Sequence, residues 1–495
     1  MPAMSALKKI FPDNRRTMFL AVFILGFAGM FAKLGDTDLQ PIGSCTYASI
    51  SREMARTGDY LTPHWPHSEE FVDFYHHPPL FFWLQSAVFK IAGADDFTAR
   101  TVSAFFGLLL ILAVYLLGNA IDDEYTGFLA ALTLILTPFF FKHSRKCELE
   151  SIFVFFTTVS FLSFVAARRK ESGLLHAISG AAAGLAFLSK GVPAGAIYAS
   201  IIPCILFFEP KLLRQPKFWI GPLSAAAVAA AWIVPQIIFK GDAFWRFYVV
   251  EQVLWKISGG DRGQAGIVDK IRGVIFYSGM FLSRFFPWAI TGFFGAVRII
   301  REKAGKLYIL LFWAGVTFAG FSAAGYREDY YLLMIWPAWC VLNGYIFNVW
   351  TRKYRPQIVS AGAATAVIIA AIVFFAPVRL SKSRNPDLKA LAPCIAKNTG
   401  RDEKVIIHKL YYWDMISLLP WYADRGVTHS VDEPEDIAAH VSSPLKKYFL
   451  MKKEDAENLA PATRKKLYVL CEQGRFVFAS NRKSAKAPAV KIPSR

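Results

Sequence analysis

The sequence predicts a polytopic all-α membrane protein of about eleven transmembrane helices, with a large first outer loop and a small C-terminal α/β domain. Composition predicts the membrane class. Hydrophobic residues make up 54% and aromatic residues 15% of the 495 residues, and the mean hydropathy is +0.34. A soluble domain cannot bury that much apolar surface. Apolar runs near the length that a hydrocarbon core of about 30 Å requires also recur along most of the chain.

The predicted spans are the apolar runs at 17–34, 98–119, 125–141, 149–167, 174–189, 193–208, 217–239, 276–299, 306–323, 328–349 and 357–378. A twelfth run, 78–93, is shorter, opens with Pro78 and Pro79, and carries Gln85 and Lys90. Its length alone leaves its status undecided, so the charges of the loops must decide it.

Basic residues predict the orientation. Lys8, Lys9, Arg15 and Arg16 precede the first span, which by the positive-inside rule places the amino terminus in the cytoplasm. If 78–93 does not span, the basic short loops at 168–170, 211–217, 298–306 and 352–355 all fall inside as well. We therefore expect 78–93 to be an interfacial helix. The first span lacks a convincing cleavage site and is expected to remain as an anchor.

The part after the last span differs in kind, and an odd number of spans places it outside. Helical patterns at 387–398, 411–423, 433–441 and 453–466 lie between strand-like segments at 404–408, 447–451, 467–471 and 475–479. We expect a transmembrane domain over 1–378 that contains the first outer loop, 35–97, and an outer α/β domain over 379–480. The basic tail 481–495 is expected to be disordered.

Other classes of protein fit less well. The net charge of +19 is concentrated in loops that orient helices and meet anionic membrane lipid, so nucleic-acid binding is not expected. The chain has no nucleotide fingerprint of the G-x-G-x-x-G or P-loop kind. Its six cysteines are scattered singly, without zinc-type spacing. Cys394 and Cys471 both lie in the outer domain, where they either pair or stay as two thiols.

The first outer loop concentrates polar chemistry. It holds Asp36, Asp38 and the segment 69–80, which joins Glu69, Glu70 and Asp73 to Tyr75, His76, His77 and a rigid Pro-Pro step. Loops of that length without a function are uncommon. The segment 47–54 is expected to form an amphipathic interfacial helix that ends near Gly58.

Further charged residues lie at the predicted outer ends of spans. Arg145, Glu148 and Glu150 lie at one turn, Lys190 ends a span, and Arg284 and Arg327 lie at two others. Cations beside carboxylates would anchor a lipid-linked phosphate and activate a hydroxyl or amine. The plainer alternatives are a snorkelling lysine at 190, a helix-start acid at 150 and an interfacial polar cluster at His76 and His77.

The pattern resembles the bacterial branch of the protein mannosyltransferase family, whose best-known class transfers aminoarabinose to lipid A, within the C-type membrane glycosyltransferase superfamily. The resemblance covers most of 15–380. It is carried by the segments 47–54 and 57–63, 74–80 with Trp83, Arg100, 145–150, 188–191, 244–248 with Glu251, 286–288, Arg327, Tyr330, Tyr331 and Pro337. It implies a polyprenyl-phosphate sugar donor, release of the polyprenyl phosphate, and inversion with an acid of the outer loops as candidate base.

Two departures from the family pattern matter. Gly43 and Ser44 stand where the family usually has Asp-Glu, so Asp36, Asp38 or Asp73 would have to replace the usual acid, or catalysis is altered. His76 and His77 stand where the family has Glu-Lys. The resemblance places the second acid at Glu150, with Glu148 as the alternative, and gives His77 the place of a lysine near the donor phosphate. Only a protonated histidine would keep that charge.

The prediction is a glycosyltransferase of the bacterial cytoplasmic membrane that acts on a lipid A, glycan or protein acceptor at the outer face. Its catalytic candidates are Asp36, Asp38, Glu148 and Glu150, and its substrate-binding candidates are Asp73, Tyr75, His76, His77, Arg145, Lys190, Arg284 and Arg327. A divalent metal on the outer carboxylates stays an open alternative without supporting ligand spacing. The rival functions are a transporter of lipid-linked glycans, which would need charged residues in mid-span, and a non-catalytic relative that binds lipid-linked sugar.

Overall fold

The computed structural model describes residues 15–68, 72–255, 266–376, 382–483 and 490–491. The predictions on Lys8, Lys9, Glu69, Glu70 and most of the 481–495 tail lie outside the described residues. The chain divides into two compact units, each with its own hydrophobic core. Unit 1 is Met1–Leu34, Tyr75–Phe81 and Arg100–Arg379, and unit 2 is Gly35–Phe74, Phe82–Ala99 and Leu380–Arg495.

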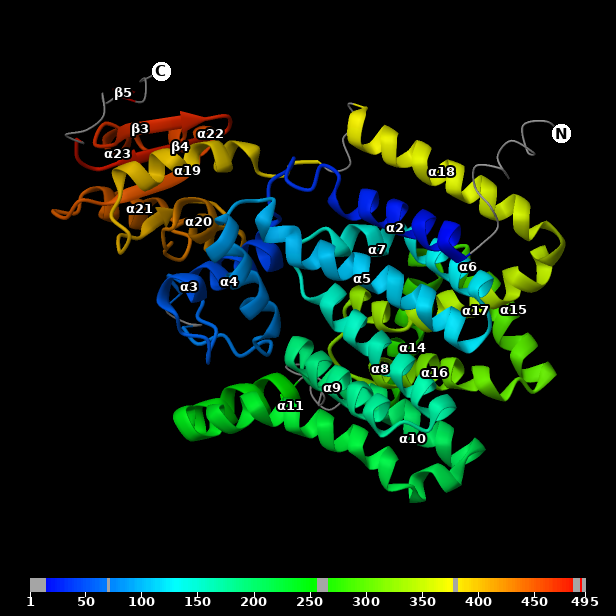
Figure 1. Ribbon diagram of the computed structural model, residues 1–495. Coiled ribbons are helices and arrows are strands. Elements are labelled where there is room, and N and C mark those ends of the chain that lie inside the picture. The colour runs from blue at the N-terminus through cyan, green and yellow to red at the C-terminus, as the bar shows by residue number, and fades with distance from the viewer. Residues whose placement is uncertain (1–14, 69–71, 256–265, 377–381, 484–489, 492–495) are drawn as a thin grey trace. The chain divides into compact units, whose positions relative to one another are not determined.

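Unit 1 is helical, and each of the predicted apolar runs contains a helix (Figure 1). Its longer helices are α2 (Arg15–Phe31), α5 (Thr98–Ile121), α6 (Glu124–Ile135), α7 (Pro138–Ser144), α8 (Glu150–Lys170), α9 (Gly173–Lys190), α10 (Ala196–Phe208), α11 (Pro216–Lys240), α14 (Ile267–Arg284), α15 (Trp288–Glu302), α16 (Tyr308–Ala323), α17 (Trp336–Thr351) and α18 (Arg355–Phe375).

Among the described residues, six helical segments are long and apolar enough to cross a membrane, or up to eight if each of two bent pairs counts as one span. The predicted count of eleven is therefore not confirmed. Two predicted runs are broken, because α6 and α7 meet at 72° and α14 and α15 at 108°. Pro138 and Pro287 lie at these breaks, where a proline cannot donate the backbone hydrogen bond that would continue the helix. The described short helix α4 (Leu80–Ala92) covers the run 78–93, and its interfacial placement stays a prediction.

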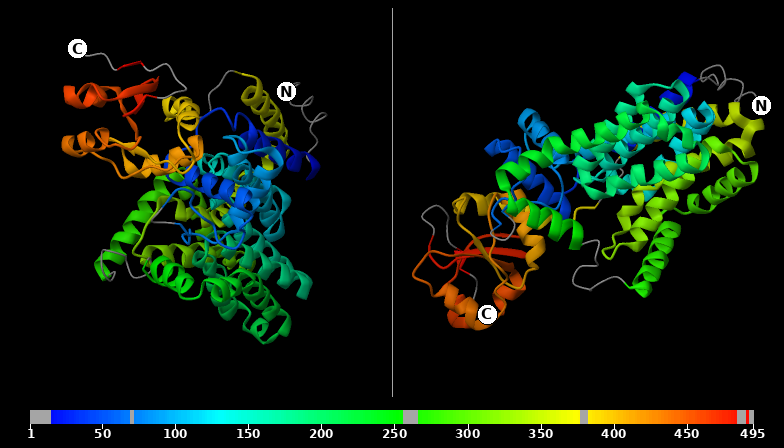
Figure 2. Two further views of the ribbon diagram at one scale, coloured as in Figure 1. Left: turned by 90° about the vertical axis from the view of Figure 1, so that its left-hand side faces the viewer. Right: turned by 90° about the horizontal axis from the view of Figure 1, so that it is seen from below.

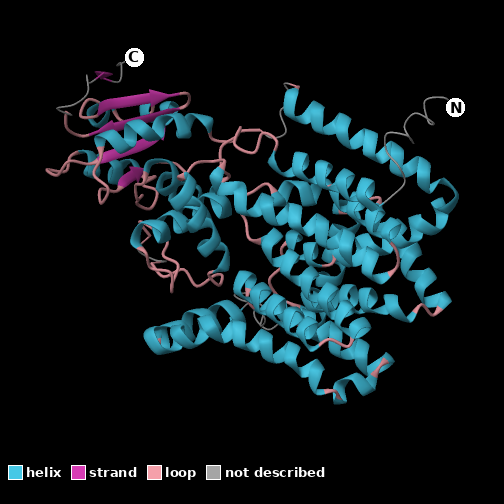
Figure 3. Cartoon of the chain, viewed as in Figure 1, coloured by secondary structure: helices cyan, strands magenta, loops and turns pink. Residues whose placement is uncertain are grey.

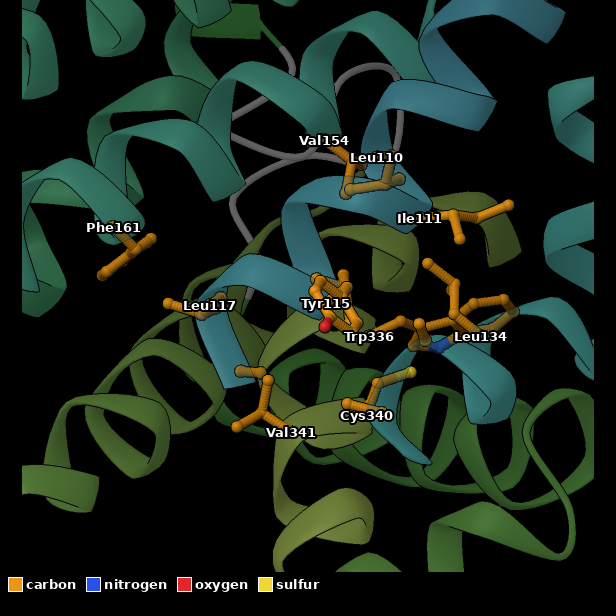
Figure 4. Packing of buried hydrophobic residues seen from close by; sticks show 14 of the residues in the cluster. Leu110, Ile111, Tyr115, Leu117, Leu134, Val154, Phe161, Trp336, Cys340 and Val341 are labelled. Carbon is orange, nitrogen blue, oxygen red and sulfur yellow. The ribbon is translucent and has the colours of Figure 1, made fainter. Parts of the chain in front are cut away.

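The core of unit 1 is built from aromatic stacking and close helix contacts. Phe161 of α8 stacks on Trp313 of α16 with ring centroids 4.0 Å apart. Figure 4 shows Tyr115, Leu134 and Trp336 gathered between their helices. Helices α9 and α11 run side by side (Figure 1). A Cβ at Gly180 of α9 would lie 1.8 Å from the carbonyl oxygen of Gly221 on α11, so this crossing requires glycine.

Unit 2 combines the first loop with the C-terminal α/β part. The loop supplies η1 (Pro41–Cys45), α3 (Thr46–Thr57) and α4. Helix α3 covers the predicted segment 47–54 and ends at Gly58, which adopts a left-handed conformation. The remaining helices are α19 (Pro386–Asn398), α20 (Tyr412–Ala423), α21 (Pro434–Val441), α22 (Lys453–Glu457) and α23 (Pro461–Arg464). The strands are β1 (Val405–Ile407), β2 (Tyr448–Lys452), β3 (Tyr468–Gln473), β4 (Phe476–Ser480) and β5 (Val490–Lys491).

The predicted strands form one sheet with the order β1-β2-β4-β3-β5. Only β1 and β2 pair in parallel among the described strands; the other pairs are antiparallel. Figure 3 shows that strands occur only in this C-terminal part of the described chain, and Figure 2 shows them from two further sides with helices beside them. Strand β5 lies within the tail that we expected to be disordered. Cys394 of α19 and Cys471 of β3 are joined as a disulfide.

Candidate functional site: a lysine-lined cavity in unit 1

Unit 1 contains a cavity of about 350 Å³ that is mostly apolar but carries several polar side chains. Its walls come from α10, α16 and the π-type helix η4 (Trp245–Leu254). The polar side chains are His76, His77, Lys190, Tyr248, Gln252, Thr317, Tyr326 and Tyr331. The structure therefore brings the predicted His76, His77 and Lys190 to one cavity, in which apolar walls surround a few polar groups, as is typical of ligand sites.

Local backbone geometry places Lys190. It is the last residue of α9, and Gly191 follows with φ +80°. A Cβ at Gly191 would lie 2.7 Å from the hydroxyl of Tyr248, so a side chain there would be both strained and crowded. Tyr248 is buried, and neither its hydroxyl nor Oε1 of Gln252 has a hydrogen-bond partner among the described residues. Both atoms keep their hydrogen-bonding capacity for a ligand.

Lys190 forms a buried ion pair with Glu150, the first residue of α8. The Lys190 Nζ donates to Oε1 of Glu150 at 3.1 Å, and the two side chains are 6% and 8% exposed. The ammonium also lies 4.8 Å from the ring centre of Tyr330 and 4.9 Å from that of Tyr331, within the range of cation–π attraction. Glu150 does not line the 350 Å³ cavity. It therefore fixes the position of Lys190.

Glu148 belongs to a second polar cluster in the turn before α8. Its Oε2 lies 2.9 Å from Nδ1 of His143, and its Oε1 accepts from Nζ of Lys146 at 3.0 Å. Burial opposes ionisation of Glu148, but the hydrogen bond from His143 and the charges of His143 and Lys146 outweigh it and hold its pKa well below the usual value. Both oxygens of this carboxylate are thus engaged.

The three predicted arginines of unit 1 tie elements of the fold together. Arg145 donates to the carbonyl oxygens of Gly29, Met30, Ala32 and Lys33 at 2.7–3.3 Å and so caps the C-terminal end of α2. Arg327 binds both carboxylate oxygens of Asp269 at 3.2 and 2.7 Å. Arg284 pairs with Asp329 at 3.4 Å. None of the three lines the cavity.

Tyr75, another predicted substrate-binding residue, is buried. Its ring stacks on that of Phe247, with the ring centroids 6.3 Å apart.

The remaining predicted acids belong to unit 2. Asp38 is buried and accepts the backbone N–H of Arg384 at 2.9 and 3.1 Å and that of Asn385, so it holds the start of α19. Asp73 pairs with Nδ1 of His64 at 2.9 Å. Asp36 is exposed and has no hydrogen bond or ion pair to another described residue.

Gly43 and Ser44 occupy the positions at which the resemblance implies Asp-Glu. Gly43 lies in a turn with φ +90°, and Ser44 is buried. Among the described residues no group of three or more His, Cys, Asp or Glu side chains is placed to hold a metal ion. Sequence reasoning did not assign roles to His143, Tyr248 or Gln252. Tyr248 lay inside a segment that carried the family resemblance, whereas Gln252 gave no signal beyond its place beside Glu251.

Sequence comparison links the chain to polyprenyl-dependent transferases. A family model described as dolichyl-phosphate-mannose-protein mannosyltransferase matches residues 76–238. A relative from Aquifex aeolicus without an assigned function is 25% identical over 68% of this chain and 65% of its own length. The undecaprenyl phosphate-alpha-4-amino-4-deoxy-L-arabinose arabinosyl transferase 2 of Proteus mirabilis is 26% identical over 58% of this chain and 51% of its own length. The match thus spans about half to two thirds of these relatives.

Structural comparison shows the fold. ArnT from Cupriavidus metallidurans, bound to undecaprenyl phosphate, superposes with a TM-score of 0.72 at 16% identity and covers 95% of this chain and 99% of its own. The oligosaccharyltransferase of Archaeoglobus fulgidus superposes with a TM-score of 0.53 at 13% identity, over 93% of this chain and 74% of its own. The sequence matches and this fold together make the chain similar to protein mannosyltransferases and to undecaprenyl-phosphate aminoarabinose transferases.

Proposed function

We propose that the protein is a glycosyltransferase that moves a sugar from a polyprenyl-phosphate donor to a lipid A, glycan or protein acceptor at the outer face of the cytoplasmic membrane. The observation that carries this proposal is the 350 Å³ cavity, which combines apolar walls with Lys190 and two histidines. The names of the relatives support the donor class, because the arabinosyl transferases use an undecaprenyl phosphate sugar and ArnT was solved with undecaprenyl phosphate.

Lys190 is the proposed anchor for the donor phosphate. An ammonium has three N–H donors, and the bond to Glu150 uses one of them. Lys190 lines the cavity, so a phosphate there could accept from a remaining N–H. The hydroxyl of Tyr248 and the imidazole of His77 line the same cavity and can donate to the other phosphate oxygens. The apolar walls suit the first isoprene units of the carrier.

The reaction then follows from charge. The acceptor hydroxyl or amine attacks the anomeric carbon, the bond from that carbon to the phosphate oxygen breaks, and polyprenyl phosphate leaves with its negative charge stabilised by Lys190. Attack from the face opposite the phosphate inverts the anomeric centre. A carboxylate must accept the acceptor's proton.

The proposed location also fits the disulfide between Cys394 and Cys471. Disulfides persist in oxidising compartments such as the bacterial periplasm and are rare in the cytoplasm. An outer-face position for the region 379–480 is therefore the consistent choice. It agrees with the positive-inside orientation predicted from the basic loops.

The decisive experiment incubates the purified protein in lipid nanodiscs with radiolabelled polyprenyl-phosphate sugars and membrane acceptors, and measures the free polyprenyl phosphate released. We expect turnover by the wild type, and loss of both donor binding and turnover in Lys190→Met. Lys306→Met is the matched control, because Lys306 is an exposed lysine away from the cavity. Equal turnover in Lys190→Met and the control would refute the proposed site.

The second candidate function is a non-catalytic protein that binds lipid-linked sugar. The observation that favours it is the replacement of the family's Asp-Glu by Gly43 and the buried Ser44. The same experiment separates the two functions. Donor binding that depends on Lys190, without release of polyprenyl phosphate under any acceptor condition, would assign the binding function.

A further inference from the structure

A second cavity of unit 1, of about 420 Å³, lies at the opposite end of α9 from Lys190. It is enclosed by the end of α8, the start of α9, the 3₁₀ turn η3 (Pro210–Arg214) and the start of α11. His176, which lines it, precedes Lys190 by fourteen positions on α9, which corresponds to about 21 Å along a helix. This cavity is therefore separate from the proposed donor site.

The charged residues around this second cavity are mainly basic. Arg168, Lys211 and Lys217 line it together with Glu171 and Glu209. Three further cations are exposed nearby in the sequence: Arg169 and Lys170 at the end of α8, and Arg214 at the end of η3. A small anion would thus enter a region in which cations outnumber carboxylates.

Two of the lining cations already have partners, and one does not. Arg168 binds the Glu209 carboxylate through two nitrogens: Nε donates to Oε2 at 3.0 Å, and Nη2 pairs with Oε1. Lys217 donates to the carbonyl oxygen of Glu171 at 3.3 Å. Lys211 forms no ion pair or hydrogen bond with any residue of the described ranges, so its ammonium is available to a ligand.

The wall of the cavity contains an independent sign of a ligand. His176 is 4% exposed, and its ring packs between Phe164 and Phe218, with centroids 6.1 and 6.0 Å away. Its imidazole lines the cavity and has no hydrogen bond to a side chain or carbonyl group of the described chain. Buried imidazoles normally have such a partner. A phosphate oxygen in the cavity would provide one.

Apolar surface continues outward from the cavity. Phe208 both lines the cavity and is 44% exposed, and its neighbour Phe207 is 75% exposed. Trp219, at the start of α11, is 46% exposed. Exposed aromatic rings beside basic residues are typical of the level where lipid headgroups meet acyl chains. A free phosphate ion would gain nothing from this surface, whereas the acyl chains of a lipid would cover it.

We propose that this cavity binds the phosphate-bearing headgroup of an anionic membrane phospholipid. Lys211 and the imidazole of His176 contact the phosphate, and Phe207, Phe208 and Trp219 contact the acyl chains. By the positive-inside rule this site belongs to the cytoplasmic leaflet. The proposal is independent of the transferase activity, because it concerns binding at the other end of α9.

The test uses native mass spectrometry of the full-length protein in detergent, with phosphatidylglycerol or phosphatidylcholine of identical acyl chains added. We expect one phosphatidylglycerol to be retained in preference to phosphatidylcholine. Lys211→Ala and His176→Phe should each weaken that binding about tenfold, the loss typical of one charge-assisted hydrogen bond. Lys397→Ala, which removes an exposed lysine of unit 2, should leave the binding unchanged.

Thermal unfolding of each variant shows whether it is folded. His176→Phe keeps a ring between Phe164 and Phe218, and Lys211→Ala removes no hydrogen bond or ion pair to a described residue, so both should fold. Equal retention of the two lipids, or equal binding by the wild type and Lys211→Ala, would overturn the site. Displacement of phosphatidylglycerol by an equal concentration of inorganic phosphate would overturn the lipid assignment in favour of a free phosphate.

Discussion

Replacement of Glu150 by glutamine should destabilise unit 1, because it leaves the charge of Lys190 buried without a counter-charge. Charges 3.1 Å apart attract by about 5 kcal/mol at an effective dielectric constant near 20. Desolvation offsets part of this attraction in the intact pair. Removal of one partner of a buried pair nevertheless costs about 3–5 kcal/mol. We expect Glu150→Gln and Lys190→Met each to lose stability in this range.

The double variant should recover most of the loss. With both charges removed, no buried charge is left unpaired, and neutral replacements of buried pairs are often as stable as the original. Methionine also keeps an unbranched side chain beside Tyr330 and Tyr331, which contact the lysine. The double variant should therefore fold like the wild type but release no polyprenyl phosphate.

Thermal unfolding in detergent, followed by tryptophan fluorescence, provides the assay. Each single variant should lower the unfolding midpoint by about 5 °C or more, and the double variant should lie near the wild type. Lys306→Met gives the effect of removing an exposed lysine. Losses that simply add in the double variant would refute the reasoning, because they would show that the two charges do not depend on each other.

Four further predictions follow from the site and from unit 2. His77→Ala should weaken donor binding and His77→Lys should keep it, because His77 lines the donor cavity and a lysine also supplies N–H donors to a phosphate; polyprenyl-phosphate titrations of both variants test this. Asp38→Asn should destabilise unit 2 by about 1–3 kcal/mol, because Asp38 accepts backbone N–H groups at the start of α19. Turnover per folded molecule should stay unchanged, and denaturation and turnover are measured on one preparation. Hydrogen bonds to Asp73 and then Asp59 raise the pKa of His64 to about 9, so the stabilisation from this cluster should be complete below about pH 6.5 and lost as pH rises through 9; unfolding midpoints from pH 6 to pH 10, with His64→Gln as the pH-insensitive reference, test this. Loss of the Cys394–Cys471 disulfide, which joins residues 77 positions apart, should destabilise unit 2 by about 4 kcal/mol; denaturation of the Cys394→Ser/Cys471→Ser variant measures it.

Distinct outcomes would contradict these four predictions. A His77→Ala protein that binds the donor as tightly as the wild type would remove His77 from the donor site. Full stability with lost turnover in Asp38→Asn would make Asp38 a chemical group. A free energy of unfolding that rises between pH 6 and pH 10 would contradict the positive charge assigned to His64 in the folded protein. Free thiols at Cys394 and Cys471 in the purified, unreduced protein would argue against an oxidising compartment for unit 2.

Local patterns were sufficient for much of the fold. Apolar runs predicted where unit 1 is helical, and alternating segments predicted strands β1 to β4, because helix and strand formation depend on neighbouring residues. Gly58 marked the end of α3 in the same way. The number of spans was less predictable, because a run such as 276–299 is divided by Pro287 and bends by 108° there, and hydropathy does not report bends.

The sequence by itself predicted the membrane class and the family resemblance, and it singled out Lys190, His76 and His77 as candidates, since these inferences depend on composition and on ordered motifs. Only the tertiary structure decided which charged residues are available to a ligand. Arg145 and Asp38 are taken up by backbone groups distant in sequence, Glu150 pairs with a lysine forty positions away, and Tyr248 faces Gly191. A side chain's availability depends on the partners that long-range packing brings to it, and no local pattern records those partners.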